Sequence, residues 1–145
     1  MNVQIREFTA ADYDAAMAIW RAAPGVVLRD ADAREPLVRY LSRNPGLSFV
    51  AVDGDEVVGA VLCGTDGRRG YLQHLAVSRS HQRRAVGRRL ADACIEALAH
   101  SGIDKCHLMI LSGNTTAASF WKSIGWTLRD DVQLMSHIAS SSQTG

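Results

Sequence analysis

The chain has 145 residues and a mass of 15.7 kDa, which fits one domain of ordinary size and leaves no room for a second hydrophobic core. Its composition is 47% hydrophobic and 21% charged, as in globular proteins, which argues against a disordered or collagen-like chain. The formal net charge of +1 gives no global positive field for nucleic acid, so any anion site must be local.

Targeting signals are not evident. No stretch reaches the roughly 18 apolar residues of a membrane span, and residues 1–7 carry charges where a signal peptide needs an apolar run. We therefore expect a cytoplasmic protein with no membrane partner. Cys63, Cys94 and Cys106 are widely spaced within apolar segments, which favours reduced core thiols over a disulfide or a metal site.

The first half of the chain predicts a strand, two helices and three further strands. Residues 3–8 alternate with period two, and Thr9 then caps a helix that ends at Pro24-Gly25. A charged segment, 29–35, leads into a second helix that runs up to residues 44–46. Strands at 47–52, 56–63 and 71–77, joined by short turns, should form an antiparallel meander.

The second half predicts a mixed sheet with helices on both faces. A helix starts near Val86 and closes at residues 100–102, and the next elements are a strand over 105–111 and a helix over 114–124. Residues 126–128 and 132–137 look like two last short strands. We expect a single domain over 1–138 and a disordered tail over 139–145.

The segment Gln82-Arg83-Arg84-Ala85-Val86-Gly87 lies between the end of a strand and the start of a helix. Such a turn exposes backbone N–H groups at the positive end of the helix dipole and can wrap a pyrophosphate. Arginine side chains at 83, 84 and 88 or 89 would add positive charge at its rim. Taken alone, these arginines would more often form only a solvated helix start.

This segment, preceded by Leu75-Ala76-Val77, resembles the acyl-CoA-binding signature of the GCN5-related N-acetyltransferase (GNAT) superfamily. Residues 114–126 are similar to a second family pattern of Asn, Ala, an aromatic pair and Gly-aromatic. The resemblance implies a mixed α/β fold with a mostly antiparallel sheet of six to seven strands. It also implies that strands four and five splay apart and that helices cover both faces.

The resemblance further implies how acetyl-CoA, the acetyl donor and only expected cofactor, would bind. Backbone groups of the fourth strand would pair with the pantetheine amides, the loop would hold the pyrophosphate, and the last helix would pack beside both. The residues implied are Leu75, Ala76, Val77, Gln82, Arg83, Arg84, Ala85, Val86, Gly87, Arg88, Asn114, Ala117, Phe120 and Trp121.

Two positions depart from the family pattern. Ala85 stands where glycine is usual, and one added methyl leaves room for phosphate provided that φ at Ala85 is negative. Trp121 stands where many members have a tyrosine that protonates the departing thiolate, and an indole N–H is no useful acid. Proton return would then fall to water or another group, or the thiolate would leave unaided, because thiols have a pKa of about 8.5.

Residues on the fourth strand are candidates for deprotonating the acceptor amine. Period two places Tyr71 and Gln73 on one face, the face that the resemblance assigns to the acceptor, and we favour them as water-holding catalytic residues. His74 suits a base by its ordinary pKa but alternates onto the other face, unless a β-bulge redirects it. Arg29 lies in the segment that lines the acceptor pocket in the family, and is a candidate substrate contact.

The sequence thus predicts an enzyme that transfers acetyl from acetyl-CoA to a primary amine by direct attack in a ternary complex, without a metal or a covalent cysteine intermediate. A small molecule, a lysine or a protein N-terminus could be the acceptor. A catalytically silent acyl-CoA-binding or sensor module is the main alternative, and a nucleic-acid-binding domain is a weaker one. The resemblance also leaves a homodimer open, through pairing of the last strands.

Overall fold

The computed structural model describes residues 2–140. The strands are β1 (Val3–Glu7), β2 (Phe49–Asp53), β3 (Glu56–Thr65), β4 (Gly70–Val77) and β5 (Cys106–Leu108). The α-helices are α1 (Tyr13–Ala22), α2 (Arg34–Arg43), α3 (Val86–His100) and α4 (Thr115–Ser123). Three 3-10 turns, η1 (Ala10–Asp12), η2 (Asp30–Asp32) and η3 (Arg79–His81), precede α1, α2 and the loop that leads to α3.

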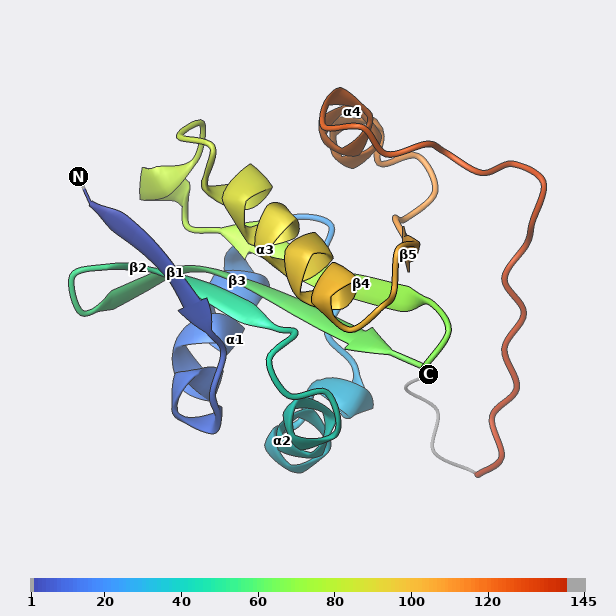
Figure 1. The fold of residues 1–145 in the computed structure, drawn as a ribbon, viewed down its shortest axis with the longest axis horizontal. Coiled ribbons are helices and arrows are strands. Elements are labelled where there is room, and N and C mark those ends of the chain that lie inside the picture. Colours follow the sequence, from blue (N-terminus) through green and yellow to red (C-terminus); the bar gives the residue numbers. More distant parts are fainter. Residues whose placement is uncertain (1, 141–145) are drawn as a thin grey trace.

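The five strands form one sheet in the order β1-β2-β3-β4-β5 (Figure 1). The first four are antiparallel neighbours, whereas β5 runs parallel to β4. The expected meander is confirmed, with Asp53 paired to Glu56 across a turn in which Gly54 adopts a φ of +63°. A left-handed residue is what such a tight turn requires.

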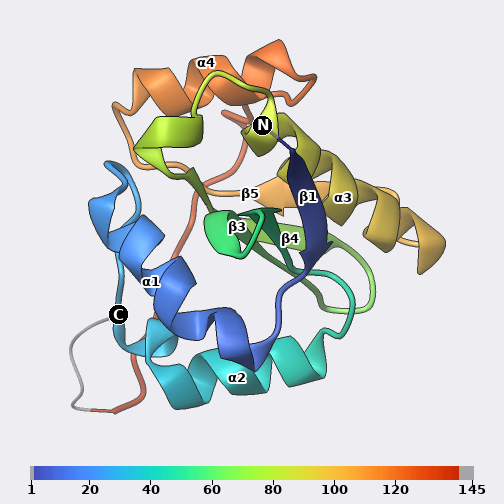
Figure 2. The same ribbon diagram turned by 90° about the vertical axis from the view of Figure 1, so that its left-hand side faces the viewer.

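Helices cover both faces of the sheet, as Figure 2 shows. One core lies under α3 and includes Leu90 and Leu98 from that helix and Trp121 from α4. The other lies under α1 and α2 and is centred on Trp20 and Leu37, both nearly inaccessible to solvent. The mixed α/β fold with helices on both faces is therefore confirmed. Cys63 and Cys94 are buried, and all three cysteines are free.

The two strands expected at 126–128 and 132–137 are absent, and the described residues form five strands rather than six or seven. Residues 125–139 have no regular structure, and Leu134 and Met135 are 74% and 93% exposed. Alternation predicts which face a strand would bury, but a strand also needs a partner for its backbone groups. Here β5 is only three residues long and offers little edge.

No helix within residues 2–140 combines the length and the apolar character needed to cross a membrane. Residues 139 and 140, at the start of the expected disordered tail, are exposed. The remainder of that tail, 141–145, lies outside the described residues.

Candidate functional site

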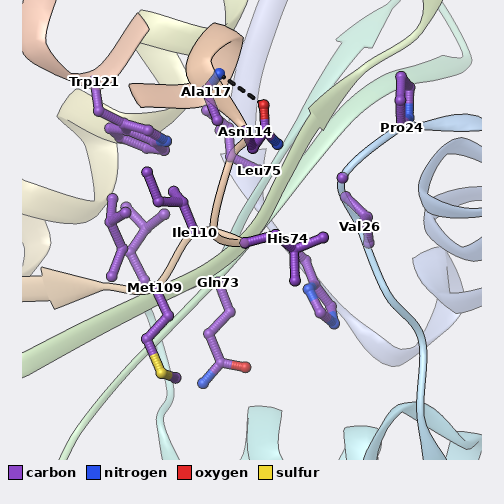
Figure 3. Close-up of a pocket in the computed structure, with 14 residues that line it drawn as sticks. Pro24, Val26, Gln73, His74, Leu75, Met109, Ile110, Asn114, Ala117 and Trp121 are labelled. Carbon is purple, nitrogen blue, oxygen red and sulfur yellow. Dashed lines mark hydrogen bonds between the residues drawn. The ribbon is translucent and has the colours of Figure 1, made fainter. Parts of the chain in front are cut away.

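The sheet opens between β4 and β5. Their pairing covers only three residue pairs and ends at Leu72 opposite Leu108, while β4 continues to Val77. A pocket lies at this opening (Figure 3). Its lining comes from the segment after α1, from β4, from the chain after β5 and from α4, and includes Val26, Gln73, His74, Leu75, Met109, Ile110, Asn114, Ala117 and Trp121. The expected splay between strands four and five is thus present.

A β-bulge interrupts β4 beside this pocket. The register with β3 shifts between Ala60, which pairs with Ala76, and Leu62, which pairs with Gln73. His74, within the bulge, has a φ of +57°, a conformation that is uncommon for any residue other than glycine. The carbonyl oxygen of His74 accepts a 2.6 Å hydrogen bond from the indole of Trp20 on α1, which fixes the bulge.

The bulge turns the His74 side chain toward α1 and α2. Its Nε2 lies 2.9 Å from Oδ1 of Asp32 in η2, and its ring packs edge-on against Trp20 at 5.2 Å between centroids. Simple alternation would have placed this imidazole on the α3 face, so the redirected arrangement is the one present. In Figure 3, Gln73 and His74 both extend away from Trp121 and Ala117.

Asp32 is held from several directions. Its Oδ2 accepts from the Arg29 amide at 3.0 Å, and its carbonyl oxygen accepts from the Tyr13 hydroxyl at 2.7 Å. Burial alone would raise the pKa of Asp32, but the hydrogen bonds from His74 and from the Arg29 amide hold it below the ordinary value. Asp32 is therefore an ionised, hydrogen-bond-accepting partner at neutral pH.

The loop before α3 has an irregular backbone. Gln82 donates from its side chain to the Val77 carbonyl at 3.1 Å, which ties the loop to the end of β4. Arg83 and Ala85 have φ values of +63° and +62°. The negative φ on which room for phosphate at Ala85 depended is therefore not met: the methyl group sits in the left-handed conformation that favours glycine. Both residues are exposed, so no packing of their side chains opposes the turn.

The N-terminus of α3 is open to a ligand. Ala85 occupies the N-cap without a side-chain cap, so the amides of the first turn have no capping partner from that residue. Gly87 lies in this turn, where an added Cβ would come within 3.4 Å of Phe120 and 3.7 Å of Leu75. The first turn of α3 therefore lies next to Leu75 of the pocket lining. By contrast, the Val86 side chain is buried in the core, which leaves only its backbone for binding.

Asn114 begins α4 at the edge of the pocket. Its Oδ1 accepts from the Ala117 amide at 3.0 Å, as expected of an N-cap, so its side-chain NH2 is the group left to face a ligand. This NH2 lies against Gly25, where an added Cβ would be 2.6 Å away. The contact brings the end of α1 and the start of α4 together over the opening.

Trp121 is part of an aromatic group on α4. Its ring lies edge-on to Phe120 and to Trp126, each at 5.0 Å between centroids, and the residue is 9% exposed. Trp121 lines the pocket and also belongs to the core, so it contributes shape and apolar surface rather than an acid.

The remaining predicted site residues are exposed. Tyr71 is 38% exposed, and its hydroxyl is 3.3 Å from Asp66. Gln73 is exposed beside the pocket, and Arg29 is exposed next to η2. Arg84 and Arg88 are also exposed on the loop and the first turn of α3.

Sequence reasoning missed Asp32 and Trp20 as site residues. In the sequence, Asp32 is one of several charges in the segment 29–35, and Trp20 is one apolar residue of the first predicted helix. No local pattern indicates that both converge on position 74. Within residues 2–140, no group of three or more His, Cys, Asp or Glu side chains is placed to hold a metal ion.

The family model and the relatives that match this chain are all described as acetyltransferases. The model of the acetyltransferase (GNAT) family matches residues 12–126. Acetyltransferase SG1711 of Sodalis glossinidius is 28% identical over 134 residues, which cover 92% of this chain and 93% of that protein. N-alpha-acetyltransferase 30 of Schizosaccharomyces pombe is 30% identical over 105 residues, covering 66% of this chain and 70% of that one.

Solved structures share the fold at low identity. A PaiA N-acetyltransferase of Thermoplasma acidophilum, in complex with coenzyme A, superposes with a TM-score of 0.80 at 18% identity, covering 90% of this chain and 92% of that one. AAC(6')-Iy, in complex with a bisubstrate analogue, gives 0.76 at 17% identity, with 95% and 99% covered.

Proposed function

The chain belongs to the acetyltransferase (GNAT) family, and from this premise we propose that it transfers the acetyl group of acetyl-CoA to a primary amine in a ternary complex. The observation that carries the proposal is the opening between β4 and β5 next to the uncapped N-terminus of α3. An unpaired strand edge suits the pantetheine amides, and helix amides suit a pyrophosphate.

Different residues of the chain would bind different parts of acetyl-CoA. Backbone groups of Leu75, Ala76 and Val77 would pair with pantetheine, and the amides of residues 83–87 would hold the pyrophosphate with Arg84 and Arg88 at the rim. Asn114, Ala117, Phe120 and Trp121 would pack along the donor. Acetyl-CoA supplies the activated acyl group, and the backbone near Leu75 would stabilise the oxyanion that forms as the amine attacks.

Gly87 offers a sharp test of the donor site. Glycine weakens a helix, and an acidic residue in the first turn is favourable. These gains offset the contact of the added side chain with Phe120, so Gly87→Asp should fold about as well as the wild type. The same carboxylate would repel a pyrophosphate at the α3 N-terminus by about 2 to 4 kcal/mol, which corresponds to a loss of at least about 30-fold in acetyl-CoA affinity. Gly87→Asn has nearly the same shape without the charge, and serves as the matched control.

Binding is measured by calorimetry and by thermal shift. Acetyl-CoA at 100 times its Kd should stabilise the wild type by about 2.7 kcal/mol, with a free adenine nucleotide as the control ligand. Gly87→Asn should retain most of this shift and Gly87→Asp should lose it. Equal binding by both variants, or no shift with the wild type, would refute the proposed donor site.

A silent acyl-CoA-binding module is the second candidate, and the buried Trp121 in place of an acidic tyrosine favours it. Turnover separates the two functions. Thiol release from acetyl-CoA is followed with a peptide bearing a free N-terminus, with a polyamine and with an aminoglycoside. Amine-dependent release supports the transferase, and tight binding of acetyl-CoA without release for any of the three supports the silent module.

A further inference from the structure

A histidine–carboxylate pair stands beside the pocket, and nothing in the proposed donor site uses it. Nε2 of His74 lies 2.9 Å from Oδ1 of Asp32, and the two side chains are 17% and 11% exposed. We propose that His74 is the base that takes the proton from the acceptor ammonium and that Asp32 is its positioning residue. This inference rests on the proposed acetyl transfer.

The Asp32 carboxylate fixes the tautomer of His74. An ionised carboxylate only accepts hydrogen bonds, so Asp32 requires the proton of a neutral imidazole to be on Nε2. The lone pair is then on Nδ1, and among the described residues no partner holds this nitrogen. The pair therefore presents an unprotonated nitrogen that is ready to accept a proton.

The backbone of His74 is strained at the bulge. His74 keeps a φ of +57° in the middle of a strand, and such conformations persist only where surrounding contacts determine them. The indole of Trp20 provides that contact by donating to the His74 carbonyl at 2.6 Å. Without the bulge, the imidazole would face α3, where no acceptor could reach it.

His74 lies at the edge of the pocket with Asp32 as its charged partner. His74 borders the pocket at the point where β4 leaves β5, next to Gln73. The titratable and charged groups around the imidazole are Asp32, Tyr13, which donates to the Asp32 carbonyl, and Arg29, whose amide binds the Asp32 carboxylate. When the imidazole takes a proton, the carboxylate stabilises the resulting cation.

The acceptor nitrogen loses two protons during the transfer. The acceptor ammonium gives one proton to Nδ1 of His74, either directly or through one water. The neutral amine forms a C–N bond with the thioester carbonyl carbon, and the C–S bond then breaks. The second proton lost by the nitrogen goes to the departing thiolate, while His74 releases its proton to solvent.

The test compares His74→Gln with His81→Gln. The amide nitrogen of glutamine can replace Nε2 as the donor to Asp32, so His74→Gln keeps this link but cannot accept a proton. His81 forms a second histidine–carboxylate pair outside the pocket, with its Nε2 2.8 Å from Asp53, its Nδ1 2.7 Å from the Ser80 hydroxyl and its side chain 10% exposed. His81→Gln thus controls for the loss of a partly buried histidine–carboxylate pair.

We expect His74→Gln to bind acetyl-CoA within threefold of the wild type and to lose about 100-fold to 10,000-fold in kcat/KM with the best amine. The acid limb of the kcat/KM pH profile should disappear. His81→Gln should retain that limb. Asp32→Asn should lower kcat and leave acetyl-CoA affinity within threefold of the wild type, because the imidazole loses the carboxylate that fixes its tautomer.

A second variant distinguishes loss of the base from misfolding. His74→Gly accepts a positive φ without strain, and added imidazole should restore part of its activity in a concentration-dependent way. If His74→Gln retains both its rate within threefold and its acid limb, His74 is not the base and Gln73 with Tyr71 regains that role. A wild type that binds acetyl-CoA but acetylates no amine would overturn the acetyl transfer and this assignment together.

Discussion

Ala85→Gly should stabilise the protein, whereas the same substitution inside a helix is destabilising. Ala85 has a φ of +62°, where an L-residue is strained by about 1 to 2 kcal/mol. Glycine removes this strain but increases the conformational freedom of the unfolded chain, at a cost of about 0.4 to 1 kcal/mol. The methyl group is exposed, so little packing is lost.

The net expectation is a gain of about 0.5 to 1 kcal/mol. For a chain of this size, that corresponds to a rise in Tm of about 2 to 3 °C. Thermal and urea unfolding at neutral pH measure it. Ala99→Gly is the matched control, because Ala99 is also exposed but lies in α3 with helical backbone angles.

The control should lose about 0.5 to 1 kcal/mol from the weaker helix propensity of glycine. The two alanine-to-glycine changes should therefore shift Tm in opposite directions. If Ala85→Gly lowers Tm as Ala99→Gly does, Ala85 is not strained in the native loop. The interpretation that Ala85 occupies a left-handed position better suited to glycine would then be refuted.

Three further changes test the packing and the charges. Gly70→Ala would press a methyl group against Leu98, so it should lower the free energy of unfolding in urea by about 1 to 3 kcal/mol. The double variant with Leu98→Ala should lose less stability than the sum of the two single changes. Trp20→Phe leaves the carbonyl at the β4 bulge without its donor and should cost about 1 to 3 kcal/mol, with Trp20→Tyr as a second variant. Hydrogen bonds from Arg6 hold the pKa of Asp12 below 3.8, so this carboxylate stabilises the fold at neutral pH and loses that effect as the pH falls through its folded pKa. The stability gap between wild type and Asp12→Asn should accordingly narrow below about pH 3.8, and a gap that stays constant would contradict the ion pair.

Features with a local cause could be predicted from the sequence. The Asp53-Gly54-Asp55 turn follows from the residue types that a tight turn requires, and Asn114 caps α4 as its position indicates. The opening between β4 and β5 followed from the family resemblance rather than from periodicity. The prediction of two last strands was wrong, because periodicity at residues 126–137 specifies which face a strand would bury but not which strand it would pair with.

The arrangement around His74 could not be predicted, because it depends on which face of β4 each side chain occupies after the bulge. Side chains alternate along a strand, so a single inserted residue reverses the face of every residue that follows it. The bulge in β4 contains no glycine or proline to mark it, and its fixing hydrogen bond comes from Trp20, 54 positions earlier. Whether the imidazole meets the acceptor or the core therefore depends on a contact between α1 and β4. A search for bases among related chains should accordingly examine the residue at the α1 position of Trp20 together with the residue at the bulge, because either one alone says little about which face the base occupies.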